Sequence, residues 1–440
     1  MKKIIVLFFL VLLIFDSKSQ TAESYIQIGI SKAERGDYNG AIADLNKAIE
    51  INPKYAYAYY NRGTVKYNLQ DYRGSIGDYN KAIELDTTYV DAYFNRGCAK
   101  NDLKNYRSAI ADFTKTIELN PEFTKAYNNR GLAKYNLQDF SGAIVDFTKA
   151  IELNPKDAEA YYNRGIPKIS LQDYRGAIAD FNKAIEINPV YAKAYYNRGT
   201  VKYNLQDYRG SIGDYNKAIE LDPEFAEAYN NRGLTKSYLK DYKGAIADYN
   251  KAIEINPVYT EAYYNRGNTN SYLEDYKGAI IEYDKAIGIN PGFANAYLNR
   301  GATKVRLEDY RSAIDDYSKA ILLNSNQIYI AYNNRGLAKD DLKDYRGAIS
   351  DFTKTIELNP KYAEAYYNRG KAKGRLQEYT GAIADFNKAI EINPKYAYAY
   401  YLRGLAKITL KDKNGACLDL SKSGELGVSD AYDLIKKYCN

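Results

Sequence analysis

The side chains of this 440-residue chain that could carry out chemistry are few, and their types exclude most classes of enzyme. The chain has no histidine and three cysteines, which excludes His-dependent catalysis, histidine metal sites and a four-thiolate zinc site. No cysteine is accompanied by a residue that could act as its general base, and no glycine-rich sequence has the pattern of a phosphate-binding loop. Carboxylates recur at fixed spacing, as a structural pattern would. We therefore expect no enzymatic activity, no cofactor and no metal.

Aromatic residues followed directly by asparagine are the most frequent candidates for binding. Tyrosine occurs 49 times. Its ring offers contact area at low entropic cost, and an asparagine amide can bond a peptide backbone. Such pairs suit peptide recognition, although the tyrosines can equally serve packing. The pairs are Tyr60 with Asn61, Phe94 with Asn95, Tyr162 with Asn163, Tyr196 with Asn197, Tyr264 with Asn265, and Tyr367 with Asn368.

Arginine and an acidic residue recur at fixed places around a repeated glycine. Arginine precedes the glycine in all units but the first, which has Ile28, and an acid follows the glycine by fifteen residues. The first unit has no preceding unit to supply an acid. We hypothesise a ladder of ion pairs between units, such as Asp44 with Arg62 and Asp78 with Arg96. The alternatives are pairing within one unit, or solvated charges that contribute little.

The glycine repeat defines the elements that position these side chains. Asn-Arg-Gly recurs every 34 residues, with one step of 35 between Gly301 and Gly336, whose extra residue falls in the loop 324–329. The period gives about twelve units. In one of them, apolar spacing predicts a helix over 227–239 and a second helix that Asp241 caps and that ends at Asn256-Pro257. Residues 20–426 are thus an array of helix pairs.

Two local features depart from the repeated pattern. Pro167 lies inside a first helix, where it should remove one backbone hydrogen bond and kink the helix; this is either a tolerated defect or a functional bend. Residues 427–440 predict a C-terminal capping helix, with Ala431, Leu434, Ile435 and Tyr438 on one face.

The three cysteines fall into two groups. Cys417 lies on the last second helix and Cys439 on the capping helix, so a disulfide would fix the cap to the array. Cys98 lies far from both in the sequence. We interpret it as a buried small apolar residue and not as a reactive thiol.

The unit resembles a tetratricopeptide repeat, as its length, its helix pair and its key residues indicate. These residues are, in one unit, Tyr229, Arg232-Gly233, Ala245, Tyr249 and Pro257. Tyrosine replaces the family's tryptophan, arginine its leucine before the glycine, and lysine, such as Lys236, its following tyrosine. The resemblance implies an all-α fold: a right-handed α-solenoid, or superhelix, of tandem helix-turn-helix repeats.

The resemblance also implies a scaffold that binds extended peptide or protein partners in a concave groove lined by the first helices. The residue three before each glycine is expected to face this groove, and this position includes the aromatic members of the pairs above. Glycan binding in the cell envelope by tyrosine stacking is the alternative. Specific contacts would come from variable positions: Tyr57, Asp91, Lys125, Glu159, Lys193 and Glu227.

The start of the chain is typical of a secretory signal peptide. Lys2 and Lys3 precede an apolar run, 4–15, and the small residues Ser17 and Ser19 follow. We expect a signal over 1–19 that is cleaved after Ser19, or alternatively kept as an interfacial anchor. The mature chain would then be exported, periplasmic or extracellular, with no integral membrane segment. The net charge of +7 is spread over interleaved signs, which argues against a nucleic-acid partner.

Overall fold

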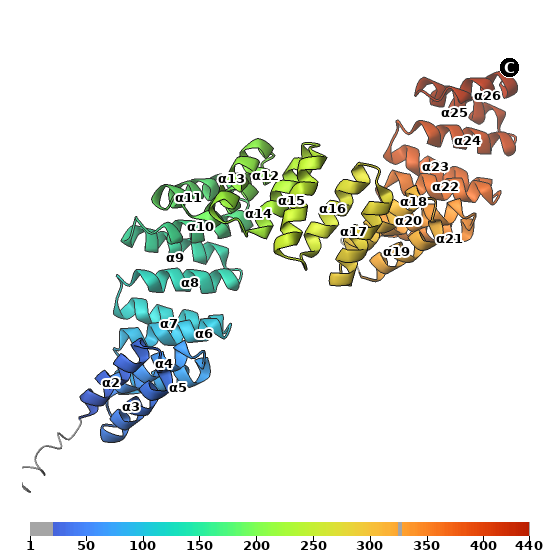
Figure 1. Cartoon of the computed structure of the whole chain (residues 1–440). Helices are drawn as coiled ribbons and strands as arrows, with labels where there is room; N and C mark the ends of the chain where they lie inside the picture. The colour runs from blue at the N-terminus through green and yellow to red at the C-terminus, as the bar shows by residue number, and fades with distance from the viewer. Residues whose placement is uncertain (1–20, 324–327, 440) are drawn as a thin grey trace, which may run out of the picture. The chain divides into compact units, whose positions relative to one another are not determined.

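The computed structural model describes residues 21–323 and 328–439, which fold into α-helices joined by short links (Figure 1). Neither of these two stretches contains a strand. The helices alternate as the first and second helix of each repeat and divide into two compact halves, one ending at Leu221 and the other beginning at Asp222. The predicted signal peptide, and most of the loop predicted to hold the extra residue, lie outside the described residues.

Each half contains six repeats. The N-terminal half is made of α2 (Ala22–Glu34), α3 (Tyr38–Ile51), α4 (Ala56–Asn68), α5 (Tyr72–Leu85), α6 (Val90–Asp102), α7 (Tyr106–Leu119), α8 (Thr124–Asn136), α9 (Phe140–Leu153), α10 (Ala158–Ser170), α11 (Tyr174–Ile187), α12 (Ala192–Asn204) and α13 (Tyr208–Leu221). The C-terminal half is made of α14 (Ala226–Tyr238), α15 (Tyr242–Ile255), α16 (Thr260–Tyr272), α17 (Tyr276–Ile289), α18 (Ala294–Arg306), α19 (Tyr310–Leu322), α20 (Ile328–Asp341), α21 (Tyr345–Leu358), α22 (Ala363–Arg375), α23 (Tyr379–Ile392), α24 (Ala397–Thr409), α25 (Lys413–Glu425) and α26 (Asp430–Tyr438).

The helix boundaries follow from capping residues, as the sequence predicts. Asp241 precedes α15, and its side chain accepts a hydrogen bond from the amide of Gly244, which would otherwise have no partner in the first turn. The helix ends at Ile255, before Asn256 and the proline that follows it. The predicted helix pair of this repeat is confirmed to within one residue at each end.

Small residues allow the two helices of a repeat to approach closely. A Cβ added to Gly131 would lie 2.8 Å from the Phe147 ring, closer than carbon atoms pack. Ala143 and Ala150 of the second helix are fully buried beside that ring. In this repeat the contact between first and second helix therefore depends on glycine facing an aromatic residue, with alanine packed around it; in the first and last repeats the glycine faces Leu45 and Leu420 instead.

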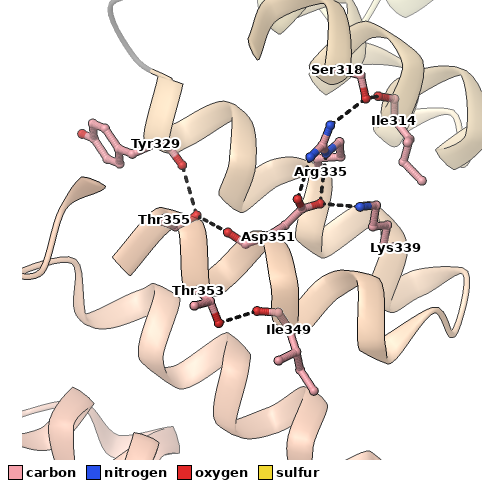
Figure 2. A network of polar contacts seen from close by, with 9 residues as sticks. All are labelled: Ile314, Ser318, Tyr329, Arg335, Lys339, Ile349, Asp351, Thr353 and Thr355. Atoms are coloured by element: carbon pink, nitrogen blue, oxygen red, sulfur yellow. Dashed lines mark hydrogen bonds and ion pairs between the residues drawn. The ribbon is translucent and has the colours of Figure 1, made fainter. Parts of the chain in front are cut away.

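A buried acid joins the two helices of each repeat, as Figure 2 shows for Asp351. Arg335 donates to its carboxylate twice, from Nε at 3.0 Å and from Nη2 at 2.7 Å. Lys339 Nζ lies 2.7 Å from the same carboxylate. The remaining guanidinium nitrogen, Nη1, donates to Ser318 of the preceding repeat at 2.9 Å. We call this arrangement of one acid, one arginine and one lysine the clamp.

The predicted ladder of ion pairs between repeats is wrong. Arg62 pairs with Asp78 of its own repeat at 2.5 Å, and not with Asp44; Arg96 likewise pairs with Asp112, and not with Asp78. The two helices of a repeat form an antiparallel hairpin, so a residue fifteen positions after the glycine returns to the level of the arginine before it. The predicted alternative, pairing within one unit, is what forms.

The arginine also contacts the preceding repeat. Its Nη1 donates a hydrogen bond to a side chain there, which in most repeats is neutral. Arg62 Nη1 donates to Asn46 at 2.6 Å, two residues beyond the acid that we predicted. In one repeat this neighbour is itself an acid, Asp284, which pairs with Arg300. Asp44 of the first repeat, which lacks the arginine, pairs with Lys32 at 2.5 Å.

Pro167 lies within α10, which runs over the same thirteen positions as the other first helices of this half. The helix is therefore not broken, and the kink stays a prediction. Pro167 is itself buried. The side chain of Asn163, whose carbonyl the proline cannot bond, is also buried.

The C-terminal cap, α26, packs against α25. Ala431 is fully buried with Leu420, and Leu434 and Ile435 are partly buried against them. Cys417 and Cys439 form a disulfide, with their Cα atoms 5.8 Å apart. Tyr438, predicted on the packed face, is instead 37% exposed, because it is the last residue of the helix and lies beyond the turn that Ala431 and Leu434 pack.

Candidate functional site

The first helices of neighbouring repeats contact one another within each half, for example α4 with α6 and α14 with α16. We call the surface that they share the first-helix face. It comprises the positions three before, one after and four after the repeat glycine. In the second repeat these are Tyr60, Thr64 and Tyr67. This is the face that the sequence predicts as the binding surface.

The predicted tyrosines and asparagines meet one another on this face, across the boundary between two repeats. Asn95 Nδ2 donates to the phenol oxygen of Tyr60 at 3.0 Å. The asparagine of one repeat thus holds the tyrosine of the preceding one. The same bond joins Asn197 to Tyr162 at 3.0 Å and Asn299 to Tyr264 at 2.9 Å.

The aromatic rings predicted to face a groove are half-buried between other rings. Tyr60 lies 6.0 Å from Tyr79 and 4.9 Å from Tyr89, measured between ring centroids. The same packing is made by Phe94 on Phe113 and Phe123, by Tyr162 on Phe181 and Tyr191, by Tyr196 on Tyr215, by Tyr264 on Tyr283 and Phe293, and by Tyr367 on Phe386 and Tyr396. These rings hold the repeats together, and their contact with a peptide stays a prediction.

The remaining predicted asparagines also bond within the protein, with one exception. Asn61 donates to the carbonyl of Tyr57 at 2.7 Å. Asn265 donates to Asn230 at 3.0 Å, and Asn368 to Asn333 at 3.3 Å. The exception is Asn163, whose Nδ2 is buried without a hydrogen-bond partner.

Burial keeps the phenols of this face neutral. It raises the pKa of Tyr60, Tyr162 and Tyr264, and the hydrogen bonds that these phenols receive from asparagine oppose that rise only in part. The first-helix face therefore offers hydrogen-bonding hydroxyls and ring surface, not phenolate charge.

The position four after the glycine carries a large ring in some repeats and a small residue beside a cavity in others. In three repeats it carries tyrosine, which packs on an aromatic residue of its own repeat: Tyr67 on Tyr72 at 5.3 Å, Tyr135 on Phe140 at 5.5 Å, and Tyr203 on Tyr208 at 5.6 Å. In three repeats of the C-terminal half it carries Ser237, Ser271 or Gly374. Each of these small residues lines a cavity, of about 270, 250 and 370 Å³ respectively.

The two smaller cavities are adjacent and have polar walls. They share Asn268 and Tyr272. The Oδ1 of Asn268 accepts hydrogen bonds from Tyr283 and Asn299, both at 2.8 Å, which directs its Nδ2 as a donor. Tyr272 is 67% exposed. These cavities were not predicted from the sequence, although serine stands at residues 237 and 271 where other repeats have tyrosine.

The cavity at Gly374 lies beside a cluster of charges. Asp340 is buried, with Lys371 Nζ at 3.1 Å and Arg375 Nε at 3.8 Å from its carboxylate. Arg375 also donates to the hydroxyl of Tyr345 at 3.2 Å. Both basic residues line the cavity, but the paired carboxylate limits the positive charge that they present to it.

The variable positions named from the sequence are exposed on the first helices: Tyr57, Asp91, Lys125, Glu159, Lys193 and Glu227. Cys98 is partly buried, and burial raises the pKa of its thiol to about 12, which leaves it unreactive. Within 21–323 and 328–439, His, Cys, Asp and Glu side chains nowhere gather in a group that could hold a metal ion. No helix of the described part is long and apolar enough to cross a membrane.

Solved structures of repeat proteins are similar to parts or most of this chain. YrrB, titled a TPR protein with an unusual peptide-binding site, is 29% identical over 42% of this chain and 95% of its own, with a TM-score of 0.36. MamA is 28% identical over 36% of this chain and 93% of its own, with a TM-score of 0.35. The Cut9–Hcn1 structure is 16% identical over 95% and 96% of the two chains, with a TM-score of 0.45. No curated protein matches.

Family models match along most of the chain. One described as TPR repeat matches residues 31–70 and 168–206. Two described as tetratricopeptide repeat match residues 90–123, 124–157, 192–225, 226–259, 329–362 and 363–396, and residues 56–89, 260–293 and 294–327. Together with tandem helix pairs built on the predicted glycine and alanine, these matches show that the chain belongs to the tetratricopeptide repeat family.

Proposed function

We propose that this protein is an exported, non-enzymatic scaffold that binds an extended peptide or protein segment on its first-helix face. The observation that supports this most is the hollowing of that face in the C-terminal half, where Ser237, Ser271 and Gly374 open cavities between aromatic rings. Ligand sites are concave and mostly apolar, with a few polar groups that orient the ligand.

Export is supported by two independent features of the chain. The basic and then apolar start predicts a signal peptide. The disulfide between Cys417 and Cys439 is of a kind that persists in the periplasm or outside the cell. Mass spectrometry of the protein from its native host tests this: a chain that begins at Gln20 supports the proposal, and one that keeps residues 1–19 contradicts it.

Peptide binding is tested with the mature chain on an array of peptides tiled over exported proteins of the native organism. Lys125 is exposed on α8, three residues before Asn128 of the first-helix face and so on the same side of the helix. Lys125→Glu should therefore weaken the binding of acidic peptides to the N-terminal half by about tenfold. The matched control is Lys149→Glu, because Lys149 is exposed on a second helix, α9. Equal effects of the two variants would contradict binding on the first-helix face.

Glycan binding is the second candidate, and one observation favours it. Tyr272 stacks on Tyr242 with ring centroids 5.9 Å apart, and it remains exposed beside amide and hydroxyl groups. Exposed rings of this kind also stack on sugars. Binding of the mature chain to a glycan array distinguishes the two candidates, because a peptide-binding scaffold should bind none of the glycans.

A further inference from the structure

The cavity at Ser237 occupies the place of a missing aromatic side chain. Tyrosine stands at the equivalent position in three repeats and packs on an aromatic residue nine after the glycine. In the repeat of Gly233 that second ring, Tyr242, is present, but Ser237 cannot reach it. Tyr272 of the next repeat covers part of the ring, and a cavity of about 270 Å³ remains.

A buried hydroxyl without a partner lies in the wall of the same cavity. Tyr249 lines it and is 0% exposed, and its phenol oxygen makes no hydrogen bond. Burial raises the pKa of this phenol, and the hydroxyl of Thr269 lowers it as a hydrogen-bonding neighbour would, but the two form no hydrogen bond, and Thr269 donates to the carbonyl of Asn265 at 2.9 Å. An orphaned buried hydroxyl costs free energy that a ligand can recover.

The residue after the glycine differs between this repeat and three others whose second helix carries tyrosine at the same position. In those three it bonds the tyrosine hydroxyl: Thr64 bonds Tyr79 at 3.3 Å, Thr200 bonds Tyr215 at 3.2 Å, and Asn268 bonds Tyr283 at 2.8 Å. Facing Tyr249, that residue is Leu234, which cannot. The missing ring and the missing hydrogen bond therefore occur in one cavity.

We propose that this cavity is the anchor site for a tyrosine side chain of an extended peptide, an inference that rests on the proposed peptide-binding function. The ligand's ring takes the place that Tyr67, Tyr135 and Tyr203 fill in their repeats, and its hydroxyl bonds that of Tyr249. Asn265 and Asn268, which also line the cavity, stand where a peptide backbone would pass. Burying the ring supplies affinity, and the hydroxyl supplies discrimination against phenylalanine.

The test uses three capped pentapeptides, Ser-Gly-X-Gly-Ser, in which X is tyrosine, phenylalanine or alanine. Binding to the mature chain is followed by NMR shifts of peptide resonances. The tyrosine peptide should bind about tenfold more tightly than the alanine peptide, and about fivefold more tightly than the phenylalanine peptide. Equal affinities for all three, or no measurable binding of any, would overturn the anchor.

Variants that copy other repeats of this chain locate the site. Ser237→Tyr with Tyr238→Asn introduces the Tyr-Asn pair found at residues 67–68, 135–136 and 203–204, and it should abolish the tyrosine preference while the helix content stays intact. Tyr238 also lines the cavity, so Tyr238→Asn alone is the matched control; it should retain the preference for tyrosine over phenylalanine even if it weakens the binding of all three peptides. A double variant that binds like the unchanged protein would place the site elsewhere.

A gain-of-site variant keeps the proposal falsifiable if Ser237→Tyr with Tyr238→Asn were to misfold. Tyr135→Ser should open an equivalent cavity in the repeat of Gly131, where the second helix carries Phe147 and leaves no orphaned hydroxyl. This second site should take phenylalanine at least as well as tyrosine.

A pentasaccharide of glucose serves as the glycan probe. If it binds and its binding depends on Ser237 in the same way, the cavity is a sugar site and not a peptide anchor. Binding of longer exported sequences on the peptide array tests the scaffold proposal independently of this cavity.

Discussion

At the scale of single residues, the departures of this chain from its family's pattern concentrate in the clamp. Arginine replaces leucine before the glycine, and lysine replaces the tyrosine three residues after it. Both cations converge on one buried acid; Asp146, for example, accepts from Arg130 and lies 2.7 Å from Lys134. In one repeat Asn270 replaces the lysine of the clamp. There the acid, Glu282, has a different lysine as its second partner, because Lys285 lies 3.5 Å from it.

Removing the acid should therefore destabilise a repeat far more than removing an exposed charge. Asp146→Ala leaves two partly buried cations without their partner and should cost about 3 kcal/mol of unfolding free energy. Asp146→Asn should cost less, since the amide oxygen still accepts a hydrogen bond. Urea denaturation with hydrogen exchange of α8 and α9 measures the change. The control, Glu152→Ala, removes only the exposed partner of Lys149; a midpoint shift equal to that of Asp146→Ala would refute the clamp's role.

At the scale of elements, the link between the two helices of a repeat is strained wherever it lacks glycine. The residue two before the start of the second helix is left-handed in every repeat described: Gly36 has φ of 84°, and Gln138 has φ of 63°. A left-handed backbone costs a residue with a Cβ about 1–2 kcal/mol. Only the first repeat has glycine there.

Gln138→Gly should consequently stabilise its repeat by about 0.5 kcal/mol, because relief of the strain outweighs the extra freedom of glycine in the unfolded chain. Gln138→Ala keeps the strained geometry and should bring no gain. Urea midpoints of the two variants, measured in parallel, decide the point. If alanine and glycine stabilised equally, the backbone strain would not be the cause.

The elements themselves were predictable from sequence, whereas their side-chain contacts were only partly so. Asp241, Asn256 and Pro257 mark the ends of a helix locally, so the prediction succeeds without knowledge of packing. The partner of Arg62 depends on how the hairpin folds back, which a count of residues along the chain does not give. The cavity at Ser237 results from a side chain that is absent, and it is visible only against the repeats where tyrosine fills that space.

At the scale of the whole molecule, the repeated tyrosines make stability depend on alkaline pH. Tyr79, Tyr283 and Tyr317 occupy one equivalent place in their second helices, and burial raises the pKa of each above the ordinary value of 10.0. The folded chain therefore retains protons that the unfolded chain releases once the pH exceeds 10.0. This stabilisation is complete below that pH and is lost progressively as the pH rises through the higher pKa values of the folded protein. Because the same group recurs along the array, the loss accumulates.

The urea midpoint should accordingly be constant up to about pH 9 and fall steeply above pH 10, where unfolding and phenolate absorbance should rise together. Two variants sharpen the test. Tyr249→Phe removes a buried phenol that has no partner, so it should flatten the alkaline fall without loss at neutral pH. Tyr79→Phe removes a phenol that bonds Thr64, so it should flatten the fall but lower the midpoint at neutral pH as well. A midpoint that declines equally in both variants and in the unchanged protein would show that another group controls the alkaline transition.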